Sequence, residues 1–138
     1  MYTGPMRFEF RFPVLHTRVV DGDSIHLLLD TGFGNRHQSL CRLENVDCPE
    51  KNTEAGKMVT TVMENWVSRR DGSLEFLSSR IGKFGRPIGT IYSQSNPSET
   101  ASIFLINSGL AKEYAGGRRS WGETELRLVE TKCRELLS

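Results

Sequence analysis

Three β-strand patterns in succession constrain the fold of this chain more than any other feature. Apolar and polar residues alternate at 7–12, the alternation resumes at 14–20 after an interruption at Pro13, and two more strand patterns follow at 25–29 and about 37–46. An Asp-Gly turn and a loop with two glycines make the connections short. The pattern predicts an antiparallel meander.

The remainder of the chain alternates between helical and strand periodicity. Apolar residues at steps of three and four mark the helices, and caps and glycines mark their ends. The first expected helix starts at Glu54, is capped by Thr53 or Asn52 and is ended by Asp71-Gly72. Strands are expected at 74–79 and 87–92 around a turn at 80–85, followed by a loop at 93–98. A second helix is expected at about 99–108, and a final helix runs from a Ser120/Glu123 capping box to Leu137.

This order, β-β-β-α-β-β-α-α, places a helix after the third of five strands, as in the OB-fold. We therefore expect an α+β, mainly β protein: a five-stranded Greek-key OB barrel with three helices. The length of 138 residues suits one domain, and we find no linker, repeat or low-complexity segment, so residues 1–138 are expected to form a single domain. Element order alone does not establish a function.

Composition excludes several classes of protein. Lys and Arg number 18 and Asp and Glu 17, so the net charge of +1 lacks the basic excess of a passive nucleic-acid binder. No apolar run approaches a membrane span, and we expect a monomer that does not associate with membranes. The first six residues lack a secretory pattern, which favours an intracellular protein; a mature form whose signal is absent fits equally.

The three cysteines are odd in number and have no CxxC spacing, which argues against a zinc site and a disulfide scaffold. Cys41 and Cys133 are interpreted as small buried apolar residues. No histidine lies near Cys48 in the sequence, so a nucleophilic role for its thiol has little support.

The stretch 41–50, Cys-Arg-Leu-Glu-Asn-Val-Asp-Cys-Pro-Glu, places the cation of Arg42 and the carboxylates of Asp47 and Glu50 within ten residues. A straight strand would point Arg42 and Asp47 to opposite faces and separate them by roughly 16 Å. If they serve one site with Glu50, the strand must bend between them, and Pro49 helps because it ends ladder pairing. Taken alone, each of these charged residues is more simply interpreted as an ordinary polar residue at the end of a strand.

Two further turns carry charged residues. In Asp21-Gly22-Asp23-Ser24, Asp21 is interpreted as the turn residue and Asp23 as a metal ligand; the other turn is Lys83-Phe84-Gly85-Arg86. A hard cation such as Ca²⁺ takes carboxylate oxygens, and arginines can donate paired hydrogen bonds to phosphate. A glutamate can orient or deprotonate water. Together the three segments would suit phosphodiester hydrolysis.

The same segments resemble the staphylococcal nuclease (thermonuclease) family. Residues 20–24 are similar to its DGDT/S turn, 42–50 to its R-L-x-x-V/I-D-T/C-P-E signature, 83–86 to its K-Y-G-R turn, and 106–111 to its N-x-x-L-V-x-x-G-L-A helix end. The matches are ordered and run from about residue 14 to the last helix.

The resemblance implies an OB barrel with three helices and Ca²⁺-dependent cleavage of DNA and RNA that leaves 3′-phosphates. The roles that it implies are Ca²⁺ ligation by Asp23, Asp47 and the main-chain carbonyl of Cys48, phosphate binding by Arg42 and Arg86, assistance to the attacking water by Glu50, and substrate contact by Lys83 and Tyr114.

The chain departs from the family at several of these positions. Only residues 51–53 separate Glu50 from the expected helix, where secreted members have a long loop. Phe84 replaces a tyrosine, and Tyr114 is displaced by one position from a base-contacting tyrosine. Cys48 replaces threonine, which leaves its carbonyl unaffected.

Three functions are therefore weighed. The first is a Ca²⁺-dependent nuclease of low sequence specificity that favours single-stranded or frayed DNA or RNA. The second is a non-catalytic OB module that binds single-stranded nucleic acid or protein, and the third is a protein-interaction domain. The intact charged set favours the first, because a binding module has no need of it; the set is Asp23, Arg42, Asp47, Glu50 and Arg86.

Overall fold

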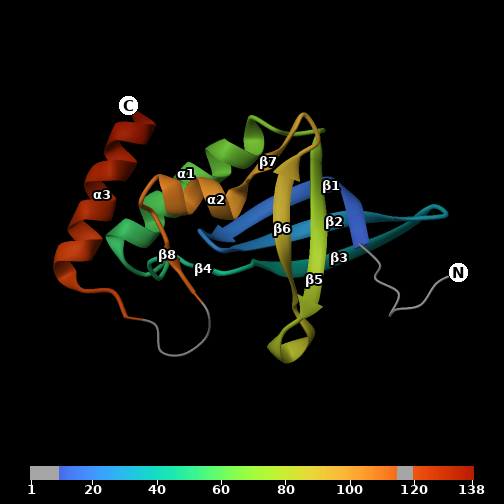
Figure 1. Cartoon of the computed structure of the whole chain (residues 1–138), viewed down its shortest axis with the longest axis horizontal. Helices are drawn as coiled ribbons and strands as arrows, with labels where there is room; N and C mark the ends of the chain where they lie inside the picture. Colours follow the sequence, from blue (N-terminus) through green and yellow to red (C-terminus); the bar gives the residue numbers. More distant parts are fainter. Residues whose placement is uncertain (1–9, 115–119) are drawn as a thin grey trace, which may run out of the picture.

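Five strands close into a barrel in the computed structural model, which describes residues 10–114 and 120–138 (Figure 1). The barrel strands are β1 (Phe10–Asp21), β2 (Ser24–Gly32), β3 (Asn35–Leu43), β5 (Leu74–Ile81) and β6 (Pro87–Ser93). Their order is β3-β2-β1-β5-β6, with antiparallel neighbours. β3 returns to pair with β6 in parallel at Arg42–Ile88 and Leu43–Gly89, which closes the barrel.

Three helices accompany the barrel, namely α1 (Glu54–Ser68), α2 (Ala101–Asn107) and α3 (Glu123–Leu137). Thr53 caps α1, since its Oγ1 accepts the Gly56 N–H at 3.0 Å, as predicted. α1 packs against β1 and α3 packs on α1 (Figure 1). The barrel and its three helices confirm the predicted α+β, OB-like class. None of the described helices has the length and apolar character needed to cross a membrane.

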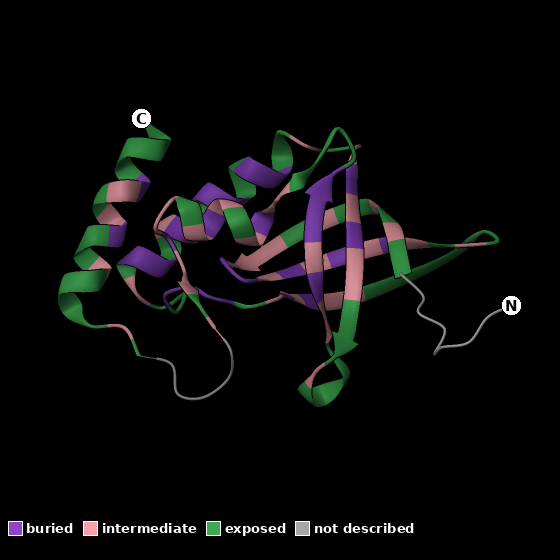
Figure 2. Cartoon of the chain, viewed as in Figure 1, coloured by how far each residue is buried: buried purple, intermediate pink, exposed green. Residues whose placement is uncertain are grey.

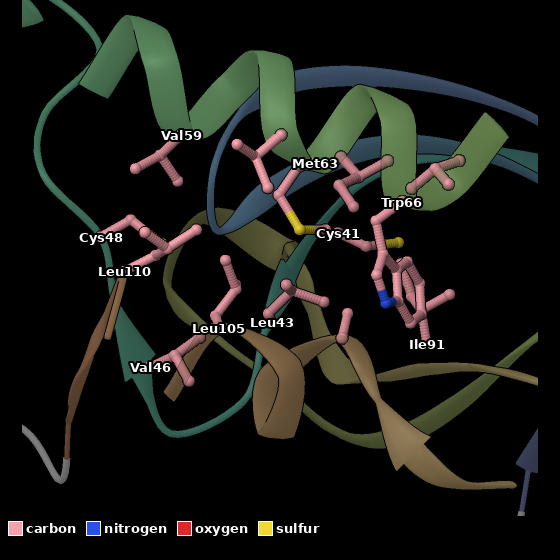
Figure 3. Packing of buried hydrophobic residues seen from close by; sticks show 14 of the residues in the cluster. Cys41, Leu43, Val46, Cys48, Val59, Met63, Trp66, Ile91, Leu105 and Leu110 are labelled. Carbon is pink, nitrogen blue, oxygen red and sulfur yellow. The ribbon is translucent and has the colours of Figure 1, made fainter. Parts of the chain in front are cut away.

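The core lies between the barrel and the inner faces of α1 and α2, where Figure 2 shows the buried positions. Side chains from both helices interdigitate with those of the strands (Figure 3). The largest fully buried side chains include Phe76, Ile25, Leu27, Leu43, Met63, Ile91 and Leu105. Cys41 and Cys133 are free and buried, as predicted, and burial raises the pKa of Cys41 to about 12.

β1 is continuous through Pro13, so the predicted interruption is wrong. Phe10–Pro13 pairs with β5, whereas the residues from Val14 onward pair with β2. Pro13 thus stands where the strand changes partner, a position at which a missing N–H is tolerated.

The predicted loop at 93–98 is also wrong in part. β7 (Asn96–Thr100) turns back and pairs with the end of β6. The next helix, α2, begins at Ala101, because Thr100 caps it by accepting the Ile103 N–H at 3.2 Å.

The start of α3 differs from the predicted Ser120/Glu123 capping box. Gly122 is the N-cap, and the Glu125 side chain accepts its N–H at 2.9 Å. Ser120 lies before the helix, and its carbonyl accepts a hydrogen bond from Lys112 Nζ at 2.7 Å. Two short strands were not predicted: β4 (Val46–Asp47) and β8 (Lys112–Glu113), which pair antiparallel.

Candidate active site

The turn between β1 and β2 brings the first carboxylates to the site. Asp21 Oδ1 accepts the Asp23 N–H at 3.2 Å, the local bond expected of a turn residue. Gly22 permits a close approach, because a Cβ there would lie 2.6 Å from Val59 Cγ1 and 2.7 Å from Cys48 Sγ. The turn therefore packs directly on the start of α1 and on the segment that follows β4.

The chain bends sharply between β3 and β4. Asn45 has φ of 61°, in the left-handed region that Asn tolerates better than most residues. Its carbonyl accepts the Tyr114 N–H at 2.8 Å, which ties the bend to the segment after α2. This confirms the predicted bend between Arg42 and Asp47.

Arg42 projects from the end of β3 into this bend. Its Nη1 lies 3.2 Å from Asp23 Oδ1, and its Nη2 donates to the Val46 carbonyl at 3.0 Å. Its guanidinium carbon lies 5.5 Å from the centroid of the Tyr114 ring. Because the guanidinium is held on three sides, its orientation is set before any substrate arrives.

Asp23 and Asp47 are both buried, each with 4% of its surface exposed. Asp23 Oδ2 accepts the backbone N–H of Cys48 at 3.1 Å, so the two acidic segments are joined directly. Asp47 Oδ2 accepts the indole N–H of Trp121 at 3.1 Å. A buried carboxylate requires such partners, and cations or N–H donors supply them.

The charged groups gather around the thiol of Cys48. Burial raises the pKa of Cys48 well above its usual range, and the negative charges of Asp23, Asp21 and Asp47 raise it further, while Arg42 lowers it. The thiol is therefore protonated at neutral pH, which removes it as a nucleophile or a soft metal ligand. Three carboxylates against one guanidinium leave an excess of negative charge in this region.

The same crowding acts on Asp21. Burial, followed by the hydrogen bond and the negative charge of Asp23, raises the pKa of Asp21 from 3.8 to about 6. A cation bound nearby would stabilise the ionised form of the Asp21 carboxyl.

The donors at this position suit a hard cation. Within residues 10–114 and 120–138, no group of three or more His, Cys, Asp or Glu side chains gathers as a metal cluster. A metal here would take the carboxylate oxygens of Asp23 and Asp47, backbone oxygen and water. Oxygen ligands of this type fit Ca²⁺ or Mg²⁺ better than zinc.

A cavity of about 170 Å³ opens beside Asp47. Glu50 lies at its exposed edge, and Trp121 and Leu126 line it from the other side. The Glu50 carbonyl accepts both the Thr53 N–H at 3.0 Å and the Thr53 hydroxyl at 2.6 Å. The short connection of residues 51–53 is thereby fastened to the cap of α1, with Glu50 facing solvent.

The remaining predicted residues lie on the turn between β5 and β6, which contains a short 3₁₀ segment, η1 (Lys83–Gly85). Arg86 is exposed, and its guanidinium carbon lies 5.7 Å from the ring centroid of Phe84, which is 90% exposed. Ile88 pairs with Arg42 where β3 meets β6, and Arg86 precedes Ile88 by two residues, just before β6 begins.

Sequence reasoning missed Trp121. It lies in a polar stretch before α3 with no periodicity around it, and only the folded chain places it against Asp47. Sequence reasoning also treated Asp21 as a turn residue alone, although its pKa is shifted.

Comparison with known proteins finds similar sequences but no family. No family model matches the chain. This chain is similar to two bacterial endonucleases. Uncharacterised endonucleases from Escherichia coli O157:H7 and from Escherichia coli are each 29% identical to it over 114 residues, which cover 78% of this chain and 69% of each relative.

Proposed function

We propose that this protein is a divalent-metal-dependent nuclease that hydrolyses phosphodiester bonds of DNA or RNA with little sequence preference. The main observation behind this proposal is that Arg42 lies 3.2 Å from the buried carboxylate of Asp23. That carboxylate also accepts the backbone N–H of Cys48, the residue next to Asp47. The name endonuclease of the two relatives and the resemblance to staphylococcal nuclease support the same reaction.

The expected ion is Ca²⁺. Asp23, Asp47 and the carbonyl of Cys48 would hold it, since they supply the hard oxygen ligands that Ca²⁺ takes and lie in a region with excess negative charge. When bound, a divalent cation stabilises the charge that develops on the phosphate.

The protein's own groups would carry out the rest of the reaction. Arg42, already oriented, and Arg86, from the exposed turn, would donate hydrogen bonds to phosphate oxygens. Glu50, at the solvent edge of the cavity, would accept a proton from the attacking water. Lys83 and Tyr114 would contact the nucleotide, which favours unpaired bases that can stack.

The test is incubation of circular single-stranded DNA with the protein in Ca²⁺, Mg²⁺, Mn²⁺ or EDTA. We expect cleavage in Ca²⁺ and none in EDTA, with ends that a polymerase extends only after phosphatase removes the 3′-phosphate. Loss of the circle also identifies endonucleolytic cutting. A circle that is bound in gel shifts but stays intact with every ion would instead support a non-catalytic OB module.

Three variants separate the roles within this assay. Arg42→Ala and Arg86→Ala should each lower turnover about 100-fold or more, because each removes donors to the phosphate. Glu50→Gln should slow cleavage while Ca²⁺ binding persists. The exposed variant Thr61→Ala, on α1, serves as the matched control. An arginine variant that cuts at the wild-type rate would overturn the role given to that arginine.

A further inference from the structure

The C-terminal part of the chain reaches Asp47 by two separate routes. In the short β4–β8 ladder, Asp47 pairs with Lys112. Further along the chain, the Trp121 indole N–H donates to Asp47 Oδ2 at 3.1 Å. Both the backbone and the carboxylate of Asp47 are therefore held by residues that follow α2.

Trp121 is itself held in place from behind. Lys112 Nζ lies 4.5 Å from the Trp121 ring centroid and donates to the Ser120 carbonyl at 2.7 Å. The same Nζ pairs with Glu125 Oε2 at 2.5 Å, and Glu125 also accepts the Gly122 N–H. The ion pair is partly exposed and adds little stability alone, but these bonds fix the loop that carries the indole.

From these contacts we infer that Trp121 is a positioning residue for the metal ligand Asp47, an assignment that rests on the proposed function. An indole N–H can donate a hydrogen bond but cannot accept one, so it holds one carboxylate oxygen of Asp47 in a set direction. Trp121 also forms a wall of the cavity next to Glu50. Partners that orient a ligand in this way typically change metal affinity by about 10- to 100-fold.

The test compares Trp121→Phe with Trp66→Phe. The first substitution removes the N–H and keeps an aromatic ring in the loop. Trp66 is the matched control, since it packs near Phe104 and Arg70 at the end of α1 away from Cys48 (Figure 3). Ca²⁺ affinity is measured by calorimetry on each folded protein, so the first readout is independent of cleavage.

We expect Trp121→Phe to weaken Ca²⁺ binding about 10-fold or more, and Trp66→Phe to change it by less than about 2-fold. The Ca²⁺ concentration for half-maximal cleavage should rise by the same factor in Trp121→Phe, with the rate recovering at saturating Ca²⁺. A purely structural role would instead lower the rate at every Ca²⁺ concentration.

A spectroscopic measurement needs no change at Trp121. Tb³⁺ takes the same oxygen ligands as Ca²⁺ and emits when a nearby excited indole transfers energy to it. In Trp66→Phe, where Trp121 is the remaining tryptophan, excitation of the indole should sensitise Tb³⁺ emission, and Ca²⁺ should abolish this emission by competition. This measurement keeps the inference testable even if Trp121→Phe fails to fold.

The outcomes distinguish the two proposals. If the wild-type protein binds neither Ca²⁺ nor Tb³⁺, the proposed metal site is wrong and the role of Trp121 is wrong with it. If the wild type binds Ca²⁺ but Trp121→Phe binds it equally well, the metal site stands and the positioning role is overturned. Unsensitised Tb³⁺ in Trp66→Phe, with Ca²⁺ binding intact, also overturns it.

Discussion

Among single residues, Arg42 joins three parts of the candidate site, since it contacts Asp23, the Val46 carbonyl and the Tyr114 ring. Its guanidinium offsets part of the negative charge of the carboxylates around Cys48, and its side chain is 20% exposed. Replacing it leaves the buried carboxylate of Asp23 without this ion pair, although the Cys48 N–H and the Ser24 hydroxyl still donate to it. The charge of the residue therefore affects stability as well as substrate binding.

We predict that Arg42→Met lowers the free energy of unfolding by about 2 kcal/mol in EDTA, because a buried carboxylate loses its cation. Saturating Ca²⁺ should restore most of this loss, since the ion would replace the missing positive charge. Urea melts with and without Ca²⁺ measure both effects. Equal loss of stability in EDTA and in Ca²⁺ would place the ion elsewhere.

Asp21 gives a prediction for pH. Its pKa is raised from 3.8 to about 6, so between these values the folded state binds more protons than the unfolded state. The contribution of Asp21 to the stability of the metal-free protein should therefore fall as the pH rises from about 4 to 6, and it should stay low above pH 6. Asp21→Asn keeps an oxygen for the Asp23 N–H and cannot ionise.

In EDTA at pH 7.5, Asp21→Asn should raise the free energy of unfolding by about 1 kcal/mol, a figure reduced for the partial exposure of the side chain. The gain should shrink toward zero near pH 4, where both proteins are uncharged at this position. Urea melts across this range provide the comparison. A gain that is the same at both pH values would show that charge is not its cause.

At the scale of elements, the bend between β3 and β4 decides whether the charged residues meet. The bend depends on the left-handed conformation of Asn45, and the Tyr114 N–H holds it from the β8 side. Asn45 is exposed, so its side chain adds little packing. Substitutions there test backbone geometry with little disturbance of the core.

Asn45→Val should lower the free energy of unfolding by about 1–2 kcal/mol, because a β-branched residue resists positive φ. It should also weaken Ca²⁺ binding, since Asp47 follows the bend directly. Asn45→Gly, which adopts positive φ freely, is the matched control and should retain both properties. Chemical denaturation and calorimetry report the two quantities. Unchanged behaviour of Asn45→Val would mean that the bend does not depend on this residue.

At the scale of the whole molecule, the junction of β3 with β6 converts a sheet into a closed barrel. Gly89 sits at this junction, paired with both Leu43 and Ser78, and its carbonyl accepts the Glu44 N–H at 2.8 Å. A Cβ at this position would lie 2.1 Å from the Leu77 carbonyl oxygen and 2.8 Å from Phe76 Cζ. Backbone must therefore move to admit any side chain.

Gly89→Ala should lower the free energy of unfolding by about 2 kcal/mol or more, because a carbonyl in a closed ladder cannot shift without breaking its neighbours. Thr61→Ala, exposed on α1, should change it by less than about 0.5 kcal/mol. Circular dichroism and tryptophan fluorescence should report a single coincident transition. Wild-type stability in Gly89→Ala would show that the junction can open at little cost.

Much of this architecture follows from local sequence patterns. The alternation in β1, β2 and β3, the 3.6-residue periodicity of α1 and the Thr53 cap each depend on neighbours in the chain, and the structure confirms them. The short pairing of β4 with β8 and the hairpin of β7 escaped prediction, because a two-residue ladder or a tight return leaves no periodic signal. The start of α3 was misplaced for a related reason: glycine can replace the expected serine as N-cap.

By itself, the sequence determined the barrel class, the charged residues available for a site and the need for a bend between Arg42 and Asp47, because these depend on periodicity and spacing along the chain. Only the tertiary structure decided that Asp23 reaches the Cys48 backbone, that the bend falls at Asn45, and that the Trp121 indole reaches Asp47. Asp23 and Cys48 are separated by 25 positions in the chain, and Asp47 and Trp121 by 74. These contacts depend on how the closed barrel packs against its helices, and no local pattern encodes that packing.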